Sequence, residues 1–381
     1  MRRRHTQARP DWVTRLADIG FTYHSADGRY WCEEASYEFV ESEIDCLEAA
    51  TESLHQLCLD AVERVIRDNR FADLHIPEAW RPRIIRSWER QDPSLYGRFD
   101  LWYDGVGAPK LIEYNADTPT ALLEASVAQW FWLQEIRPGG DQFNSLHERL
   151  IRRWTELRRG AFGDMVHLAC MDHSEEDRQN LLYLADTACQ AGWRVQTLGM
   201  DQIGWDGAAR RFVDVANTPI DILFKLYPWE WMGLDAFATH LSPDVMTVLE
   251  PAWKQVLSHK GLLALLWEWF PGHPNLLPAA FSAPIDPTAF VQKPFWSREG
   301  ANITIVNGAK VLTTDGPYND GGSVYQEYVP FPDFDGWHPI IGSWIIGDEA
   351  GGIGIREDQG LVHGNLSRFA PHEFVKEVPI S

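Results

Sequence analysis

A strand–helix–strand pattern in the middle of the sequence constrains the fold more than any other feature. Met165–Cys170 and Trp193–Leu198 are apolar runs of strand length. Between them, Ser174–Ala191 has the pattern of a helix that begins with a capping serine and acidic residues, and a third apolar run follows at Ile220–Leu226. Because strands joined through a helix run parallel, this part of the chain predicts a small parallel sheet.

The rest of the chain predicts helices before this unit and short strands after it. Residues 37–70 place apolar side chains at three- and four-residue steps, which is typical of a long amphipathic helix, and Thr120–Glu135 shows helical patterning as well. The proline-rich residues 271–289 indicate a boundary or a long ordered loop, and Asn307-Gly308 is a strong hairpin signal. The strands expected after the proline-rich segment are Phe290–Lys293, Ile303–Val306, Val311–Thr313, Ser323–Tyr328 and Ile340–Ile346.

Charge and cysteine content exclude several classes of protein. The 381 residues include 55 acidic and 34 basic side chains, so the net charge of −21 argues against a nucleic-acid partner. The five cysteines are odd in number and lack C-x-x-C spacing, so neither a disulfide framework nor a zinc knuckle is predicted. The N-terminus does not read as a signal peptide, and the strongest apolar run, Gly261–Phe270, is about half as long as a membrane span. We therefore expect a cytoplasmic protein without a membrane partner.

A predicted hairpin brings four polar side chains to one face. If its strands turn tightly about Val106-Gly107, residue i faces residue 213 − i, so Asp100 lies opposite Glu113 and Arg98 opposite Asn115. Two opposed carboxylates repel each other unless a cation lies between them, and these oxygens are ligands that Mg²⁺ prefers. Two other interpretations stay open: a solvated polar face, and a buried ion pair between Arg98 and one of the acids.

The usual nucleotide-binding loops are absent from the sequence, so nucleotide chemistry would need another cradle. Neither G-x-x-x-x-G-K-[ST] nor a G-x-G-x-x-G after a strand occurs, and H-E-x-x-H and G-x-S-x-G are missing too. Lys293 ends a strand-like run and precedes a small-residue loop at 297–302, an arrangement that can hold phosphates, although a surface lysine explains it too. Residues 323–329 can pair with an adenine edge or simply form an edge strand.

Six long motifs spread along the chain are distinctive: YGRFDLWYD (96–104), LIEYNADTPTALLEA (111–125), FKLYPWEWM (224–232), KGLLALLWEWFPGHPNLLPA (260–279), QKPFWSREGANI (292–303) and GIREDQGLVHGNLSRF (354–369). These motifs resemble the synthetase part of glutathionylspermidine synthase and its stand-alone relatives, which are ATP-grasp ligases. The resemblance runs through nearly the whole chain and implies an α/β (α+β) ATP-grasp fold in circularly permuted order, with a pre-ATP-grasp α/β domain.

The resemblance also implies roles for single residues and the cofactors ATP and Mg²⁺, with two ions expected. The implied magnesium ligands are Asp100, Glu113 and Asn115, and the implied stabilisers of the transferring phosphoryl group are Arg98 and Arg356. The implied nucleotide contacts are Lys260, Lys293, Gly300, Ala301, Gln326, Glu327 and Tyr328. The implied substrate contacts are Thr118 and Thr120 on the thiol-peptide side, and Glu175 and Glu176 on the polyamine side. Glu175 and Glu176 also read simply as the acidic first turn of a helix.

The hairpin and the resemblance together imply an ATP- and Mg²⁺-dependent acid–amine ligase that works through an acyl phosphate. We expect residues 1–160 to hold a helical region and the metal-binding hairpin, 161–255 the pre-ATP-grasp substrate domain, and 256–381 the nucleotide-binding region. The expected partners are a small carboxylate, with glutathione as one candidate, and an amine such as a polyamine; the sequence leaves room for a homo-oligomer. Two rivals stay open: a catalytically silent nucleotide-binding scaffold, and a phosphotransferase that stops before ligation.

Overall fold

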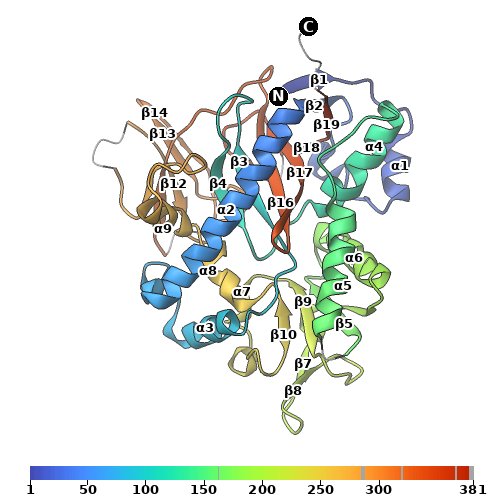
Figure 1. The fold of residues 1–381 in the computed structure, drawn as a ribbon, viewed down its shortest axis with the longest axis vertical. Coiled ribbons are helices and arrows are strands. Elements are labelled where there is room, and N and C mark those ends of the chain that lie inside the picture. Colours follow the sequence, from blue (N-terminus) through green and yellow to red (C-terminus); the bar gives the residue numbers. More distant parts are fainter. Residues whose placement is uncertain (162, 285–287, 319–320, 365–366, 377–381) are drawn as a thin grey trace.

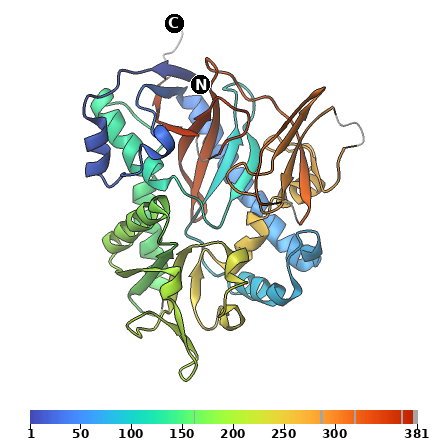
Figure 2. The same cartoon turned by 180° about the vertical axis from the view of Figure 1, so that it is seen from behind.

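The computed structural model describes residues 1–161, 163–284, 288–318, 321–364 and 367–376. Within these ranges the chain forms four β-sheets, a short two-stranded ribbon and helices packed between and around them (Figure 1). Figure 2 shows the molecule from behind, with the sheet that contains β12 (Ala289–Pro294) beside the central strands and the α/β unit (residues 165–249) at the lower end. The architecture is mixed α/β.

The strand–helix–strand region forms the predicted parallel sheet. In spatial order its strands are β10 (Thr247–Leu249), β9 (Ile222–Leu226), β5 (Met165–Cys170) and β6 (Arg194–Gly199). All neighbouring pairs are parallel, and α6 (Glu175–Gln190) connects β5 to β6 beside α5 (Leu146–Gly160). The backbone N–H of Asp177 donates to Ser174 Oγ, so Ser174 caps α6 as expected.

The predicted hairpin lies in the central antiparallel sheet, next to strands from the end of the chain. The order of this sheet is β18 (Arg368–Ala370), β17 (Glu349–Asp358), β16 (His338–Ile346), β3 (Tyr96–Trp102) and β4 (Lys110–Asn115). Arg98 pairs with Asn115 and Asp100 with Glu113, as the register predicts. The register shifts by one residue directly after Asp100, so the rule i to 213 − i holds only on the side where the four polar residues lie.

A third sheet contains four of the five strands predicted after the proline-rich segment, while the fifth, Ile340–Ile346, is part of β16 in the central sheet. Its order is β11 (Ala279–Ala280), β15 (Ser323–Glu327), β12 (Ala289–Pro294), β13 (Thr304–Asn307) and β14 (Lys310–Thr313). The Asn307-Gly308 turn between β13 and β14 is confirmed, with Gly308 at a φ of 60°. Because β15 pairs with strands on both sides, the edge-strand interpretation of residues 323–329 is wrong. Residues 285–287 of the proline-rich segment lie outside the described residues.

The long helix predicted over residues 37–70 is shorter than expected at its start. Residues Ala35–Val40 form strand β2, and α2 (Glu41–Arg67) follows directly. Tyr37 and Phe39 are two residues apart and fully buried, so this segment has the period of a strand. β2 pairs with β1 (Arg2–His5) and β19 (His372–Val375), which brings both ends of the chain to one sheet (Figure 1).

The remaining helices are short and connect the sheets. The segment predicted as helical over Thr120–Glu135 begins after Thr120, and a π-helical turn (Glu124–Ala128) leads into α4. The helices are α1 (Trp12–Asp18), α3 (Arg81–Glu89), α4 (Gln129–Ile136), α7 (Trp229–Met232), α8 (Gln255–Ser258) and α9 (Leu262–Trp269), and the ribbon is β7 (Gly204–Asp206) with β8 (Arg211–Val213). Among the described residues, none of the helices combines the length and apolar character that crossing a membrane requires.

Candidate active site

The polar face of the β3–β4 hairpin forms a network around two carboxylates. Asp100 and Glu113 sit opposite each other, and the amide nitrogen of Asn115 lies 3.3 Å from Asp100 Oδ2 and 3.2 Å from Glu113 Oε1. Asp100 is almost fully buried. The solvated-face interpretation is therefore wrong for this end of the hairpin.

Two arginines pair with the Asp100 carboxylate. Arg98 donates from Nε to Asp100 Oδ1 at 2.8 Å, and Arg356 on β17 donates from Nη2 to Oδ2 at 2.8 Å. The ion pair that competed with a metal site in the sequence interpretation is thus present. Although burial opposes the charge of Arg98, its attraction to Asp100 raises the pKa of the guanidinium. The carboxylate of Asp100 therefore forms ion pairs with two arginines that come from different strands.

Glu113 pairs with a lysine from another part of the chain. Lys260 Nζ lies 3.0 Å from Glu113 Oε2 and donates to the carbonyl oxygen of Ser297 at 2.5 Å. Burial raises the pKa of Glu113, but the charges of Lys260 and Lys293 lower it by more, so the carboxyl is held well below its usual range. Glu113 therefore stays ionised at neutral pH.

A cavity of about 100 Å³ brings most of the predicted nucleotide residues together. Lys293 is 5% exposed and donates to the carbonyl oxygen of Ile112 at 2.8 Å and to Gln326 Oε1 at 2.7 Å, which rules out a surface lysine. Burial lowers the pKa of Lys293 to about 8. The predicted residues that line this cavity are Asp100, Glu113, Lys260, Lys293, Gly300, Gln326, Glu327, Tyr328 and Arg356; Ala301 is not among them.

The backbone at position 300 can accommodate only glycine. Its φ is 69°, and a Cβ atom at this position would lie 2.5 Å from the carbonyl oxygen of His363. The loop that contains Gly300 therefore approaches the backbone after β17 more closely than any other residue type allows.

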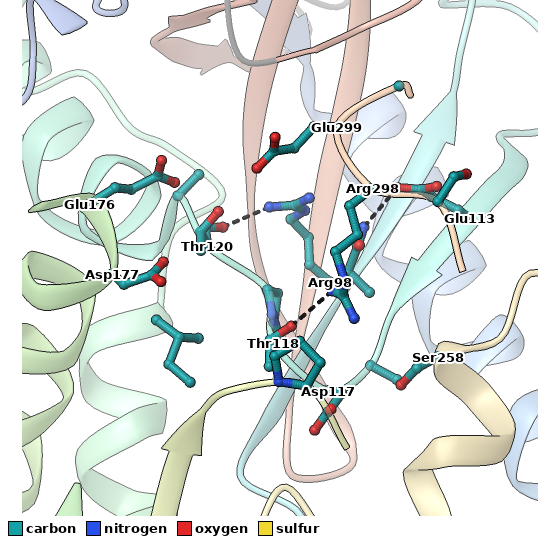
Figure 3. A pocket seen from close by; sticks show the side chains of 18 of the residues that line it. Arg98, Glu113, Asp117, Thr118, Thr120, Glu176, Asp177, Ser258, Arg298 and Glu299 are labelled. Atoms are coloured by element: carbon teal, nitrogen blue, oxygen red, sulfur yellow. Dashed lines mark hydrogen bonds between the residues drawn. The ribbon is translucent and has the colours of Figure 1, made fainter. Parts of the chain in front are cut away.

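A second cavity, of about 500 Å³, lies next to the first. Figure 3 shows Glu176 and Asp177 on one side, Glu113, Arg98 and Arg298 on the other, and Thr118 and Thr120 between them. Predicted residues that line it are Arg98, Glu113, Asn115, Thr118, Thr120, Glu176, Lys260, Gly300 and Arg356. Residues that the sequence analysis did not single out also line it, among them Tyr23, Tyr30, Asp117, Asp177, Arg298 and Glu299.

The acidic first turn of α6 points two of its three carboxylates into this larger cavity. Glu176 and Asp177 line it, whereas Glu175 is exposed and accepts a hydrogen bond from Thr22. Burial and the neighbouring charge of Glu176 raise the pKa of Asp177 to about 7, and burial also raises the pKa of Glu176. Asp177 directly follows the two predicted acids, so a cap-and-first-turn pattern could have suggested it.

Arg298 crosses the larger cavity from the loop after β12. It donates to Thr118 Oγ1 at 3.2 Å and pairs with Glu230 on α7. Its neighbours in the quoted loop motif could have suggested it from the sequence. No comparable signal exists for Tyr23 and Tyr30, which come from an irregular N-terminal segment.

The two cavities meet at a small group of charged residues. Glu113, Lys260 and Arg356 line both of them, together with Ser297, Gly300 and His363. A ligand in the smaller cavity and a ligand in the larger one would therefore come together beside two carboxylates and several cations. This arrangement can stabilise charge that moves between the two ligands.

The oxygens at this junction fit a magnesium ion. Among the described residues, no group of three or more His, Cys, Asp and Glu side chains is placed to hold a metal, so a cation here would rest on Asp100, Glu113 and Asn115. Two carboxylates and an amide oxygen are ligands of the hard type that Mg²⁺ takes. The Asn115 amide turns its NH₂ group toward the carboxylates, and half a turn of that amide presents its oxygen to a cation instead.

Comparison with known proteins shows which family the chain belongs to. The sequence matches the family model described as glutathionylspermidine synthase pre-ATP-grasp over residues 3–375, nearly its whole length. The chain belongs to the glutathionylspermidine synthase family. Its members in this comparison are named ligases, and the chain is accordingly an ATP-dependent ligase.

This member of the glutathionylspermidine synthase family covers nearly the whole length of one relative and only part of others. A Haemophilus influenzae protein named as an acid–amine ligase is 44% identical over 96% of this chain and 98% of its own length. The trypanothione synthetase of Crithidia fasciculata is 29% identical over 89% of this chain, and the bifunctional glutathionylspermidine synthetase/amidase of Escherichia coli is 28% identical over 96%. The chain spans only 57% and 64% of those two longer proteins.

A solved structure supports the fold of this family member. The apo form of a glutathione synthetase-like effector from Globodera pallida superposes with a TM-score of 0.55, covering 97% of this chain and 100% of that chain. At 11% sequence identity, this likeness shows the fold alone. Together with the family match over residues 3–375, it confirms the predicted ATP-grasp architecture of mixed α/β class.

Proposed function

We propose that the protein joins a small carboxylate to a cationic amine through an acyl phosphate, at the junction of the two cavities. One observation carries the proposal: Glu113, Lys260 and Arg356 line both cavities, so a nucleotide in the smaller one would place its terminal phosphate beside a substrate in the larger one. The small cavity has the buried Lys293 and Gln326 at its wall, which suits phosphate and adenine.

In the first step, a carboxylate oxygen of the acid attacks the γ-phosphorus of ATP and ADP leaves. ATP supplies the phosphoryl group that activates the acid, and Asp100, Glu113 and Asn115 would hold a Mg²⁺ ion that would neutralise the charge of the reacting groups. The acid is already ionised, so the protein needs no general base here, and its work is positioning and charge neutralisation. Arg98 and Arg356 flank Asp100 and would offer their N–H groups to the phosphoryl oxygens as negative charge develops on them.

In the second step, the amine loses the proton of its ammonium form and its nitrogen attacks the acyl carbon; phosphate leaves, the nitrogen releases a second proton and an amide forms. The amine would enter through the larger cavity, where the carboxylates of Glu176 and Asp177 suit an ammonium group. Thr118 and Thr120 lie between these acids and the arginines, so the acid substrate would lie along them. We take glutathione and spermidine as first candidates because relatives are named for glutathionylspermidine.

A screen of ATP turnover over a matrix of acids and amines tests the proposal. We expect phosphate release to require both an acid and an amine, with a product mass equal to their sum less one water. A phosphorylated acid that forms without any amide would favour a phosphotransferase. ATP binding without turnover in any combination would favour a nucleotide-binding scaffold. Either result would overturn the proposed ligation.

A further inference from the structure

Lys225 lies beneath the larger cavity and holds a carboxylate that lines it. It is fully buried on β9, and its Nζ donates to Asp117 Oδ1 at 2.5 Å. The other oxygen of Asp117 accepts the backbone N–H of Trp229 at 2.9 Å. The Lys225 ammonium also lies 4.8 Å from the centre of the Trp229 ring. Asp117 is thus fixed to the α/β unit through both of its oxygens.

Asp117 belongs to the segment 115–120, and its neighbours contact the reaction centre. The Asn115 amide touches both hairpin carboxylates, and the carbonyl oxygen of Thr120 accepts a hydrogen bond from Arg98 Nη1 at 2.6 Å. Thr118 accepts a hydrogen bond from Arg298. This segment leaves β4 and crosses to the parallel sheet, where the paired carboxylate of Asp117 anchors it. A shift of Asp117 would therefore move contacts of both Arg98 and the hairpin carboxylates.

We propose that Lys225 is a positioning residue, which acts through Asp117 to fix Asn115 and Arg98 for phosphoryl transfer. Lys225 lines neither cavity, so it cannot touch a substrate itself. The inference rests on the proposed function, because it assumes that phosphoryl transfer takes place at this junction. It also goes beyond that function, because Lys225 lies in the α/β unit and would affect the reaction at the β3–β4 hairpin, which belongs to another sheet.

A second buried ion pair provides a matched control. Lys254 Nζ lies 2.8 Å from Glu250 Oε2 and donates to the carbonyl oxygen of Tyr96 at 2.6 Å, and both side chains of the pair are fully buried. Neither Lys254 nor Glu250 lines either cavity. Loss of either lysine leaves a buried carboxylate without its cation, so both substitutions should destabilise the fold. Only the Lys225 substitution should also change the chemistry.

The experiment compares Lys225→Met with Lys254→Met in the full chain, at a temperature below both melting transitions. For Lys225→Met we expect kcat for ATP turnover, with glutathione and spermidine or the pair that the screen identifies, to fall at least tenfold. The KM for ATP should rise by no more than the factor that Mg²⁺ adds to ATP affinity in the wild type, because no residue from 115–120 lines the smaller cavity and only the metal-dependent part of binding passes through Asn115. For Lys254→Met both constants should stay within about twofold, despite a comparable loss of melting temperature.

A binding measurement tests the inference without turnover. Affinity for a non-hydrolysable ATP analogue is titrated with and without Mg²⁺. We expect Lys225→Met to keep the metal-free affinity and to lose most of the increase that Mg²⁺ gives the wild type, because Asn115 is displaced. Lys254→Met should keep that increase. If wild type shows no turnover, the proposed function fails, while this comparison still tests the placement of Asn115.

Two outcomes would overturn the inference. One is a Lys225→Met protein whose kcat and Mg²⁺ response both match the wild type; the other is an equal loss of both in the two methionine variants. If Lys225→Met does not fold, the double variant Lys225→Met with Asp117→Asn removes both buried charges and keeps an acceptor for the Trp229 N–H. Recovery of stability without recovery of kcat or of the Mg²⁺ response supports positioning, whereas recovery of all three shows that the pair is merely structural.

Discussion

The two cavities are built in different ways. The smaller cavity, where we propose that the nucleotide binds, takes most of its polar lining from strands, with Glu113 on β4, Lys293 on β12, Gln326 on β15 and Arg356 on β17. The larger cavity takes its polar lining mostly from loops and from the first turn of α6, with Thr118, Arg298 and Glu176 arriving from segments far apart in the sequence. The strand-derived lining of the smaller cavity, which we call the strand-built wall, is positioned by strand register. The lining of the larger cavity, which we call the loop-built wall, is positioned by how separate units pack together.

This difference separates what the reaction needs from what the substrate needs. Strand pairing fixes side chains to within one register step, which suits phosphoryl transfer, where small displacements reduce the rate. Loops and helix ends can change their side chains without disturbing a sheet, which suits a choice of amine and acid. Substitutions on the strand-built wall should therefore reduce the rate of phosphoryl transfer or the binding of the nucleotide, while those on the loop-built wall should change which substrate is used.

The largest effect is expected for Glu113→Gln, because Glu113 lines both cavities. Loss of one carboxylate charge from the hairpin should lower Mg²⁺-dependent ATP turnover by about 10²–10³-fold, on the scale of losing a cation that neutralises transition-state charge. The measurement is phosphate release, with circular dichroism to check the fold. Asp104→Asn, exposed at the turn of the same hairpin and lining neither cavity, should stay within about twofold of the wild type. Retention of more than a tenth of turnover by Glu113→Gln would contradict the assignment.

Arg356→Lys should come next, with a loss confined to rate. The guanidinium now donates to Asp100 and would turn its planar fork to phosphoryl oxygens, a geometry that an ammonium group cannot reproduce. We expect kcat to fall by about 10²-fold with ATP affinity nearly unchanged. Arg368→Lys is the matched control, because Arg368 pairs with Glu357 outside both cavities and should leave kcat unaffected. Equal losses of affinity and rate in Arg356→Lys would place this residue outside the transition state.

Lys293→Met should weaken nucleotide binding and also reduce stability. A lysine that served only to bind phosphate would contribute little to packing. The two short hydrogen bonds of Lys293, to the Ile112 carbonyl and to Gln326, change that expectation, because their loss leaves buried acceptors unpaired. We expect the Kd for ATP to rise at least tenfold and the free energy of unfolding to fall by about 1–3 kcal/mol. Calorimetry and thermal denaturation measure the two quantities. Lys310→Met, exposed on β14 of the same sheet, should change neither; unchanged ATP affinity in Lys293→Met would show a purely structural lysine.

Sequence reasoning succeeded where one local period sets the geometry. The alternation within strands 96–104 and 110–115 was enough to place Asp100 opposite Glu113, and the cap at Ser174 fixed the start of α6. It failed where two periods compete: residues 37–40 fit a helix pattern, but strands β1 and β19 on either side draw them into a sheet. The register shift after Asp100 also left no trace in the residue pattern.

The loop-built wall was harder to predict because packing brings its residues together. Nothing in the local sequence relates Tyr30 to Asp177, or Lys225 to Asp117. The first two line one cavity, and the other two form an ion pair, only when the α/β unit packs against the rest of the chain. The family resemblance added Thr118, Thr120 and Glu176, which do line the larger cavity. Glu175, beside Glu176, shows the limit of such a transfer, because one residue along a helix turns a side chain out of the cavity.

The smallest effect, and the one most specific to the loop-built wall, is expected for Asp177→Asn. The pKa of Asp177 is about 7 in the folded protein, because burial and Glu176 disfavour its charge, against about 3.9 in an unfolded chain. The folded state therefore holds a proton that the unfolded state has lost between about pH 4 and 7, and stability falls as pH rises through that window. Above pH 7 the full difference would be ~4 kcal/mol, which we reduce to about 1–2 kcal/mol because the side chain is partly exposed.

Asp177→Asn should remove this loss, so its free energy of unfolding at pH 8 should exceed that of the wild type, while the two should agree near pH 4. Denaturant unfolding between pH 4 and 8 measures it, and Glu175→Gln, on the same helical turn but outside the cavity, should follow the wild-type curve. Spermidine binding should show the reverse trend: affinity of the wild type should rise severalfold as Asp177 ionises, because the amine keeps its charge over this range, and Asp177→Asn should lose that rise. A wild-type affinity that does not change from pH 5 to 8 would remove Asp177 from the amine side of the cavity, and would leave the strand-built wall as the part of the site whose chemistry the structure explains.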